Sequence, residues 1–162
     1  MDIDQESIEK LQAKGVKAIF GMFEDKHVDL PDDYFDVVIC NDVIEHMISH
    51  DMFFETIQKK LKKNGSLVGS IPNVRFYKNL KHLLFEKDWK YQESGILDTT
   101  HLRFFTKKSL RRSLISNGYN ISKLEGIEGS RAPILRLFLA LTLGKHNDIR
   151  YRQLAFRATI KD

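Results

Sequence analysis

The chain has 162 residues, 42% of them hydrophobic and 30% charged, with a net charge of +4, so it can bury the core of one compact domain but not of two. Its single cysteine, Cys40, excludes an internal disulfide framework and any cysteine-rich zinc or iron–sulfur site. No apolar run is long enough to span a bilayer and no secretory signal opens the sequence, so we expect a cytoplasmic protein without a membrane span.

The first third of the chain predicts one helix and two strands. Gln5–Ala13 has helical periodicity, with Asp4 as its N-cap and Gly15 where a left-handed residue ends a helix. Val16–Phe20 is a short apolar run that predicts a strand. Phe35–Cys40 is β-branched and apolar on both faces, which is typical of a parallel strand buried on both sides.

The middle of the chain continues this alternation. Ser49 or Asp51 begins a predicted helix that ends near Leu61, and Ser66–Ile71 reads as another buried strand. A further helix is predicted around Arg75–Phe85. Short connections between strand, helix and strand favour a parallel α/β sheet.

The last third predicts a helix over Lys107–Asn117, capped by Thr106. Two strands, about Tyr119–Gly126 and Gln153–Ile160, flank an apolar helix that follows Pro133. A helix followed by a strand, a helix and a final strand would complete one end of the sheet.

Three segments carry a resemblance to a known family: Pro31–His46 (PDDYFDVVICNDVIEH), Leu61–Asn73 (LKKNGSLVGSIPN) and Asp98–Thr106 (DTTHLRFFT). Together they resemble the class I S-adenosylmethionine-dependent methyltransferases. The first is similar to that fold's fourth strand and the acidic loop after it, and the second to its fifth strand. The third is similar to the Asp-x-x-His-Leu-Arg-Phe-Phe-Thr segment of one bacterial branch.

The resemblance implies an α/β fold with a Rossmann-like methyltransferase sheet, mostly parallel with a C-terminal antiparallel strand. The sheet is expected to be incomplete, without the first strand and most of the second. The family's N-terminal Gly-rich turn is lacking, since Gly126 and Gly129 are isolated and lie near the other end of the chain. We therefore expect a single truncated domain over residues 1–162, with a substrate-side insertion or lid at 73–106.

The resemblance also implies cofactor contacts for S-adenosylmethionine. Asp2 matches the carboxylate that binds the ribose hydroxyls, and Ile3 its apolar neighbour against adenine. Met22 stands where the family places an aspartate against the adenine amino group, and Phe23 offers a backbone N–H and a stacking face. Asn41 and Asp42 match the loop that contacts the methionine part. The alternatives are local: Asp2 favours the start of a helix, and Asn41 and Asp42 form an Asx-type turn.

Candidate catalytic and substrate-binding residues follow in the same three segments. His46 is a candidate general base toward a hydroxyl acceptor, with Glu45 beside it at the substrate entrance. His101 and Arg103 alternate with apolar residues, so both would point into the cleft. Asn73 falls at the end of a strand, where such sheets bind ligands.

Each of these residues has an alternative role. The Glu45–His46 pair also suits a structural helix start, or a metal site as in some relatives, although we expect no metal here. His101 and Arg103 would otherwise tie the lid to the loop below it.

The missing strands would leave a buried strand with an open edge, which favours pairing with other chains. We expect the Val16–Phe20 strand to close this gap, another chain to cover it, or the sequence to belong to a longer protein. The specific prediction is a homo-oligomer or strand exchange through that edge.

Two function hypotheses remain open. The first is methyl transfer to an oxygen or nitrogen of a small-molecule or glycan-type acceptor, and the second is a non-catalytic binding module that keeps the scaffold. Residues 1–55 carry a net charge of −10 and residues 56–162 one of +14. The basic part suits nucleic acid, phosphorylated sugars or anionic lipid headgroups, or simply solvated helix faces. We expect no nucleic-acid partner, because no RNA-recognition signature is present.

Overall fold

The computed structural model describes residues 4–23 and 30–161, which divide between two compact units, residues 1–32 and 33–162. The first unit contains helix α1 (Gln5–Ala13). The Asp4 carboxylate accepts hydrogen bonds from the backbone N–H groups of Glu6 and Ser7, and Gly15 follows the helix at φ +75°. The predicted helix and both of its end signals are confirmed.

The predicted strand Val16–Phe20 is wrong. Within it only Phe20 makes an isolated bridge, and Val16 to Ala18 take no regular structure. Val16 and Phe20 are both exposed. A strand is stabilised by its neighbours, and the described part of this unit offers no second strand.

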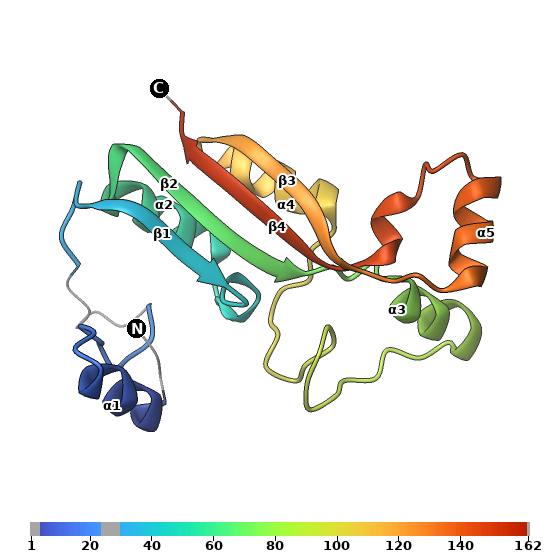
Figure 1. The fold of residues 1–162 in the computed structure, drawn as a ribbon, viewed down its shortest axis with the longest axis horizontal. Helices are drawn as coiled ribbons and strands as arrows, with labels where there is room; N and C mark the ends of the chain where they lie inside the picture. Colours follow the sequence, from blue (N-terminus) through green and yellow to red (C-terminus); the bar gives the residue numbers. More distant parts are fainter. Residues whose placement is uncertain (1–3, 24–29, 162) are drawn as a thin grey trace. The chain divides into compact units, whose positions relative to one another are not determined.

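The second unit is built on a four-stranded sheet of β1 (Phe35–Asn41), β2 (Leu61–Pro72), β3 (Tyr119–Gly129) and β4 (Tyr151–Ile160). The strands lie in the order β1-β2-β4-β3, as Figure 1 shows. β1 and β2 are parallel, whereas β4 is antiparallel to both β2 and β3. The four predicted strands of this unit are therefore confirmed, with β2, β3 and β4 longer than expected.

The expected mostly parallel sheet is wrong, because only the β1–β2 pair is parallel and the remaining pairs are antiparallel. The expectation of a mostly parallel sheet depended on further parallel strands beside β1. Among the described residues β1 is instead an edge strand, and the C-terminal return of the chain supplies half of the sheet.

One face of the sheet is covered by helices α2 (His50–Lys60) and α4 (Lys107–Ser116), which lie behind the strands in Figure 1. The Ser49 and Thr106 side chains cap them, as the sequence predicts. The Tyr119 hydroxyl donates to the Phe54 carbonyl across 2.8 Å, so strand β3 is fastened to α2 in the core.

The other face of β1 is open in this unit, contrary to the prediction of a strand buried on both sides. Val37 is 51% exposed and Ile39 is 68% exposed, whereas Cys40, which faces the helices, is buried. The β-branched run predicts the strand correctly, but burial depends on what covers each face.

Beyond the carboxyl end of β2 lie α3 (Tyr77–Lys81), which continues as a π-helical turn η2 (His82–Glu86), helix α5 (Pro133–Leu141) and the 3₁₀ turn η3 (Asn147–Arg150). The predicted helix around Arg75–Phe85 is thus present, starting two residues late. No helix within 4–23 or 30–161 is both long and apolar enough to cross a membrane.

Candidate functional site

The candidate site begins where β1 ends. Asn41 closes the strand and Asp42 follows at φ +50°, with both residues exposed. The Asp42 N–H donates to the Ser70 carbonyl at 3.0 Å, and its Oδ1 accepts from Gln153 Nε2 at 2.9 Å. The turn is therefore held against both β2 and β4.

A 3₁₀ turn, η1 (Ile44–His46), then places a buried carboxylate under this edge. Glu45 is 1% exposed, and among the described residues neither of its carboxylate oxygens has a hydrogen-bond partner. Burial raises the pKa of Glu45 to about 8, and the nearby charge of Asp42 adds to the rise. A buried carboxyl group without hydrogen bonds is unusual in folded proteins.

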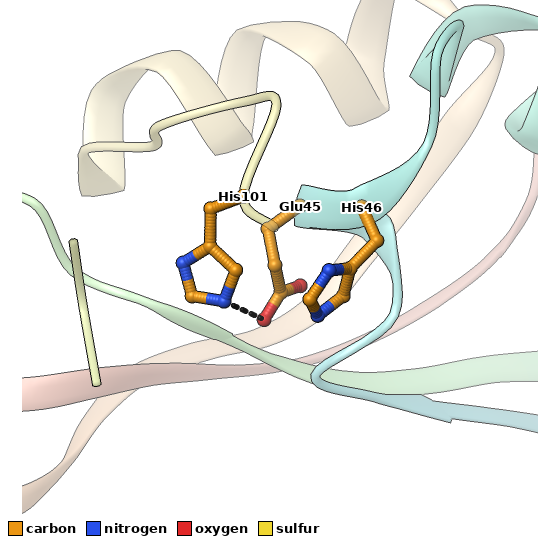
Figure 2. A group of neighbouring side chains, drawn as sticks. All are labelled: Glu45, His46 and His101. Atoms are coloured by element: carbon orange, nitrogen blue, oxygen red, sulfur yellow. Dashed lines mark ion pairs between the residues drawn. The ribbon is translucent and has the colours of Figure 1, made fainter. Parts of the chain in front are cut away.

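Two imidazoles flank Glu45 (Figure 2). His101 Nε2 lies 4.0 Å from Glu45 Oε1, and the His46 and His101 rings meet edge to face with centroids 4.8 Å apart. His46 Nδ1 faces the Thr100 carbonyl at 3.2 Å, and His101 Nδ1 faces the Ile96 carbonyl at 3.0 Å. A carbonyl only accepts, so each Nδ1 carries a proton that it donates to the backbone.

The segment that carries His101 is fastened over η1. The Glu45 carbonyl accepts from the N–H groups of Leu102 and Arg103, at 2.8 and 3.0 Å. Asp98 Oδ1 accepts from the Thr100 hydroxyl at 2.6 Å and from its N–H at 2.7 Å, and these bonds lower the pKa of Asp98. The turn geometry of this loop is therefore built in by the sequence Asp98-Thr99-Thr100.

A cavity of about 250 Å³ opens beside the two imidazoles. Its lining residues are Asp42, His46, Pro72, Gly95, Ile96, Asp98, His101, Arg152 and Gln153. The predicted residues Asp42, His46 and His101 are thus brought together, with Glu45 beneath them.

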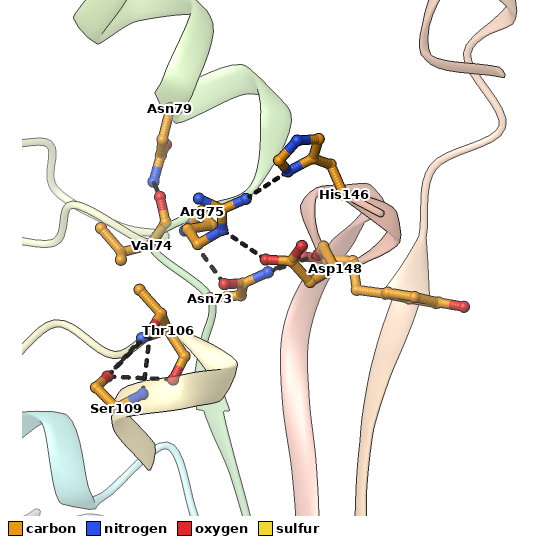
Figure 3. Close-up of polar contacts among 9 residues, drawn as sticks. Asn73, Val74, Arg75, Asn79, Thr106, Ser109, His146 and Asp148 are labelled. Carbon is orange, nitrogen blue, oxygen red and sulfur yellow. Dashed lines mark hydrogen bonds and ion pairs between the residues drawn. The ribbon is translucent and has the colours of Figure 1, made fainter. Parts of the chain in front are cut away.

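Two other predicted substrate residues are engaged elsewhere. Asn73 is fully buried, and its Nδ2 donates to the carbonyls of Asp148 and Tyr151, both at 2.9 Å, as Figure 3 shows in part. Arg103 is exposed and donates to the Ile48 carbonyl, whereas His101 is buried, so the two side chains do not share one environment as predicted. Neither residue lines the cavity.

Of the predicted cofactor residues, Asn41 and Asp42 lie exposed at the end of β1, and Asp42 lines the cavity. Met22 and Phe23 belong to the first unit, where Met22 is half exposed. Asp2 and Ile3 lie outside the described residues.

The sequence interpretation missed the three other polar side chains of the cavity wall: Asp98, Arg152 and Gln153. Asp98 had a visible signal, because it opens the Asp-x-x-His segment. Arg152 and Gln153 lie in β4, whose insertion beside β2 no local pattern indicates.

Comparison with known proteins places this geometry in a family. Residues 1–124 match the family described as methyltransferase domain. No curated protein matches the chain.

Solved structures share the fold at low sequence identity. A SAM-dependent methyltransferase of Thermotoga maritima superposes with a TM-score of 0.66 at 17% identity, covering 98% of this chain and 71% of that one. One of Archaeoglobus fulgidus gives 0.65 at 18% identity, covering 97% and 73%.

A third match is to the complex of the Haloferax volcanii Trm112 methyltransferase activator with a methyltransferase. It gives a TM-score of 0.63 at 14% identity, covering 99% of this chain and 70% of that one. Because the family match covers most of the sequence, this chain belongs to the methyltransferase domain family.

Proposed function

We propose that the chain acts in S-adenosylmethionine-dependent methyl transfer to an oxygen or nitrogen of a small-molecule or glycan-type acceptor. The observation that carries the proposal is the convergence of Glu45, His46 and His101 beside a cavity at the carboxyl ends of β1 and β2. Ligands of open α/β sheets bind at this edge.

Within this proposal the two imidazoles act on the acceptor. The Nε2 atom of His46 is placed to take a proton from a hydroxyl group during attack, while Nδ1 of each ring is held by a backbone carbonyl. His46 is the more accessible of the two, which favours it as the base, with His101 positioning the acceptor. S-adenosylmethionine supplies the activated methyl group, so the protein mainly aligns the acceptor.

The cofactor residues in this proposal are those that the resemblance implies. Exposed Asn41 and Asp42 fit hydrogen bonds to the methionine part. Met22 lacks an acceptor for the adenine amino group, so Phe23, with Asp2 and Ile3, would carry nucleoside recognition. The printed sequence carries no Gly-rich turn, and we infer that tight binding requires one.

The same cluster fits a divalent cation, contrary to the sequence expectation of no metal. Glu45, His46 and His101 each offer one ligand atom, and these atoms lie within 4.8 Å of one another. The two carboxylate oxygens of Glu45 lack hydrogen-bond partners among the described residues, so they would be available to bind a cation. A bound cation would act as a Lewis acid on an acceptor hydroxyl.

Further parts of the proposal concern the branch and the organisation of the chain. The Asp98–Thr106 segment supports the bacterial branch with the Asp-x-x-His-Leu-Arg-Phe-Phe-Thr pattern. We assign residues 73–106 as the substrate-side lid of a cytoplasmic domain, and the backbone bonds from Leu102 and Arg103 to Glu45 support this assignment.

A second candidate is a non-catalytic binding module. It is favoured by Asn73 and Arg103, whose polar atoms bind the protein itself, and by Met22 in the adenine position. Such a module would keep the fold and the interaction surfaces without holding the cofactor.

Calorimetric titration with S-adenosylhomocysteine distinguishes the two. Methyl transfer predicts measurable heat and a rise in the unfolding temperature, whereas the binding module predicts neither at millimolar ligand. A parallel series with Mn²⁺ and Mg²⁺ tests the cation site.

In that series Glu45→Gln should abolish the cation-induced rise in unfolding temperature. His82→Ala is the matched control, because His82 is half exposed on η2 and pairs only with Glu86 among the described residues. Equal responses of both variants would contradict the cation site.

A further inference from the structure

Helix α5 carries apolar residues on a buried side and on an exposed side. Leu135 is buried. The exposed side presents a set that we call the outer stripe: Ile134, Leu137, Phe138, Leu141 and Leu143. The first four are spaced as one face of a helix, and Leu143, 85% exposed, extends the stripe past its end. A helix that is apolar all round normally lies in a core or against a membrane.

The charge around the outer stripe has one sign. Residues 129–147 contain no acidic residue but include Arg131, Arg136 and Lys145, all exposed. An amphipathic helix at a membrane surface combines large apolar side chains with cations in this way. Anionic headgroups attract each such cation by about 1 kcal/mol.

A cavity of about 610 Å³, the basic cavity, adjoins the stripe. Its cationic lining residues are Arg75, Lys107, Lys108, Arg111 and Lys145, and His146 lies beside them. The only carboxylate in the lining, that of Asp148, is paired with Arg75 at 2.6 Å. Lys107 and Lys108 stand in the first turn of α4, which holds no acidic residue and where the helix dipole disfavours cations. A bound anion would balance the positive charge of the cavity lining and that of the first turn of α4.

The stripe and the basic cavity are physically joined. Gly144, in the cavity lining, follows Leu143 directly. The Phe138 ring lies 6.0 Å from the His146 ring, centroid to centroid, and His146 Nδ1 lies 3.5 Å from Arg75 Nη2 (Figure 3). The outer stripe therefore ends at the rim of the basic cavity.

We propose that the outer stripe and the basic cavity together form a peripheral docking surface for an anionic lipid membrane. The stripe lies at the boundary between headgroups and acyl chains, and the cavity binds a lipid phosphate. A second copy of the chain fits this surface less well, because an isologous interface would bring Arg131, Arg136 and Lys145 of both copies together.

The test is flotation of the full chain with vesicles of phosphatidylcholine alone, or with about one third phosphatidylglycerol. The protein should float with the anionic vesicles only, and added salt should release it. Leu137→Glu should weaken binding by about tenfold or more, since it places a charge in the apolar layer. Met52→Glu on α2 is the matched control, because Met52 is 65% exposed and Leu137 is 62% exposed.

Charge reversal tests the basic cavity separately. Lys108→Glu should weaken flotation more than Lys63→Glu. The second variant makes the same charge change at an exposed position of β2, away from the cavity lining. Circular dichroism confirms that each variant is folded.

Three outcomes would overturn the proposal. If the surface variants and their controls lost flotation equally, the binding would be nonspecific electrostatic attraction. Binding of inorganic phosphate without flotation would assign the cavity to a free anion. A dimer that Leu137→Glu dissociates, in a protein that does not float, would assign the stripe to a second copy.

Discussion

Replacing Asn73 by alanine should destabilise the protein strongly, because this residue joins three separate segments. Its Nδ2 donates to the Asp148 and Tyr151 carbonyls at 2.9 Å, and its Oδ1 accepts from the Arg75 N–H at 3.1 Å. Each bond contributes about 1 kcal/mol net, and a buried carbonyl left unpaired costs about 1–3 kcal/mol more. The expected loss in free energy of unfolding is therefore about 4–6 kcal/mol.

Urea and thermal unfolding measure this loss, with an expected fall in the unfolding temperature of about 10 °C. Asn79→Ala is the matched control, since Asn79 makes one long bond, 3.4 Å to the Val74 carbonyl, and should cost less than about 1 kcal/mol. An Asn73→Ala protein within about 1 kcal/mol of wild type would refute the reasoning. An acceptor-binding role would instead raise KM and leave unfolding unchanged.

Three further predictions concern the sheet. Burial raises the pKa of the Cys40 thiol to about 12, helped by the charge of Glu45, so iodoacetamide should modify it only after unfolding, as mass spectrometry would reveal. Gly126→Ala places a methyl group on the Tyr151 ring and should cost about 1–3 kcal/mol in urea unfolding; an unchanged midpoint would contradict the packing. Among the described residues β1 is an edge strand with an exposed apolar face, so the protein should self-associate in analytical ultracentrifugation; lysines at Val37 and Ile39 place charges on that face and should return it to monomer, and a clean wild-type monomer would contradict this.

Local signals predicted most elements of the second unit. Ser49 and Thr106 fix helix starts through hydrogen bonds to residues three positions on, so the sequence contains the whole interaction. The strand at Val16–Phe20 failed because an apolar run becomes a strand only with a partner. The exposure of Ile39 escaped prediction for the same reason.

The candidate site was predictable in part. The Glu45–His46 pair is adjacent in sequence and needs only the turn after β1 to be placed. His101 joins this pair, and Gln153 binds Asp42, through contacts between segments far apart in the sequence. The spacing of residues along the chain does not reveal such contacts. Asn73 was assigned to substrate because its position at a strand end is visible, whereas its partners lie far along the chain.

The position of β4 has a consequence for how the chain folds during synthesis. β2 and β3 are not paired with each other, and β4, the last strand, joins them. While the ribosome is still making residues 151–160, α2, β2, α4 and β3 exist without the element that unites them. The emerging chain therefore exposes an edge of β2 and an unpaired β3 until β4 has been made, so these strands cannot join progressively. A premature stop within β4 would leave the β1–β2 pair and a single unpaired β3, both open to aggregation.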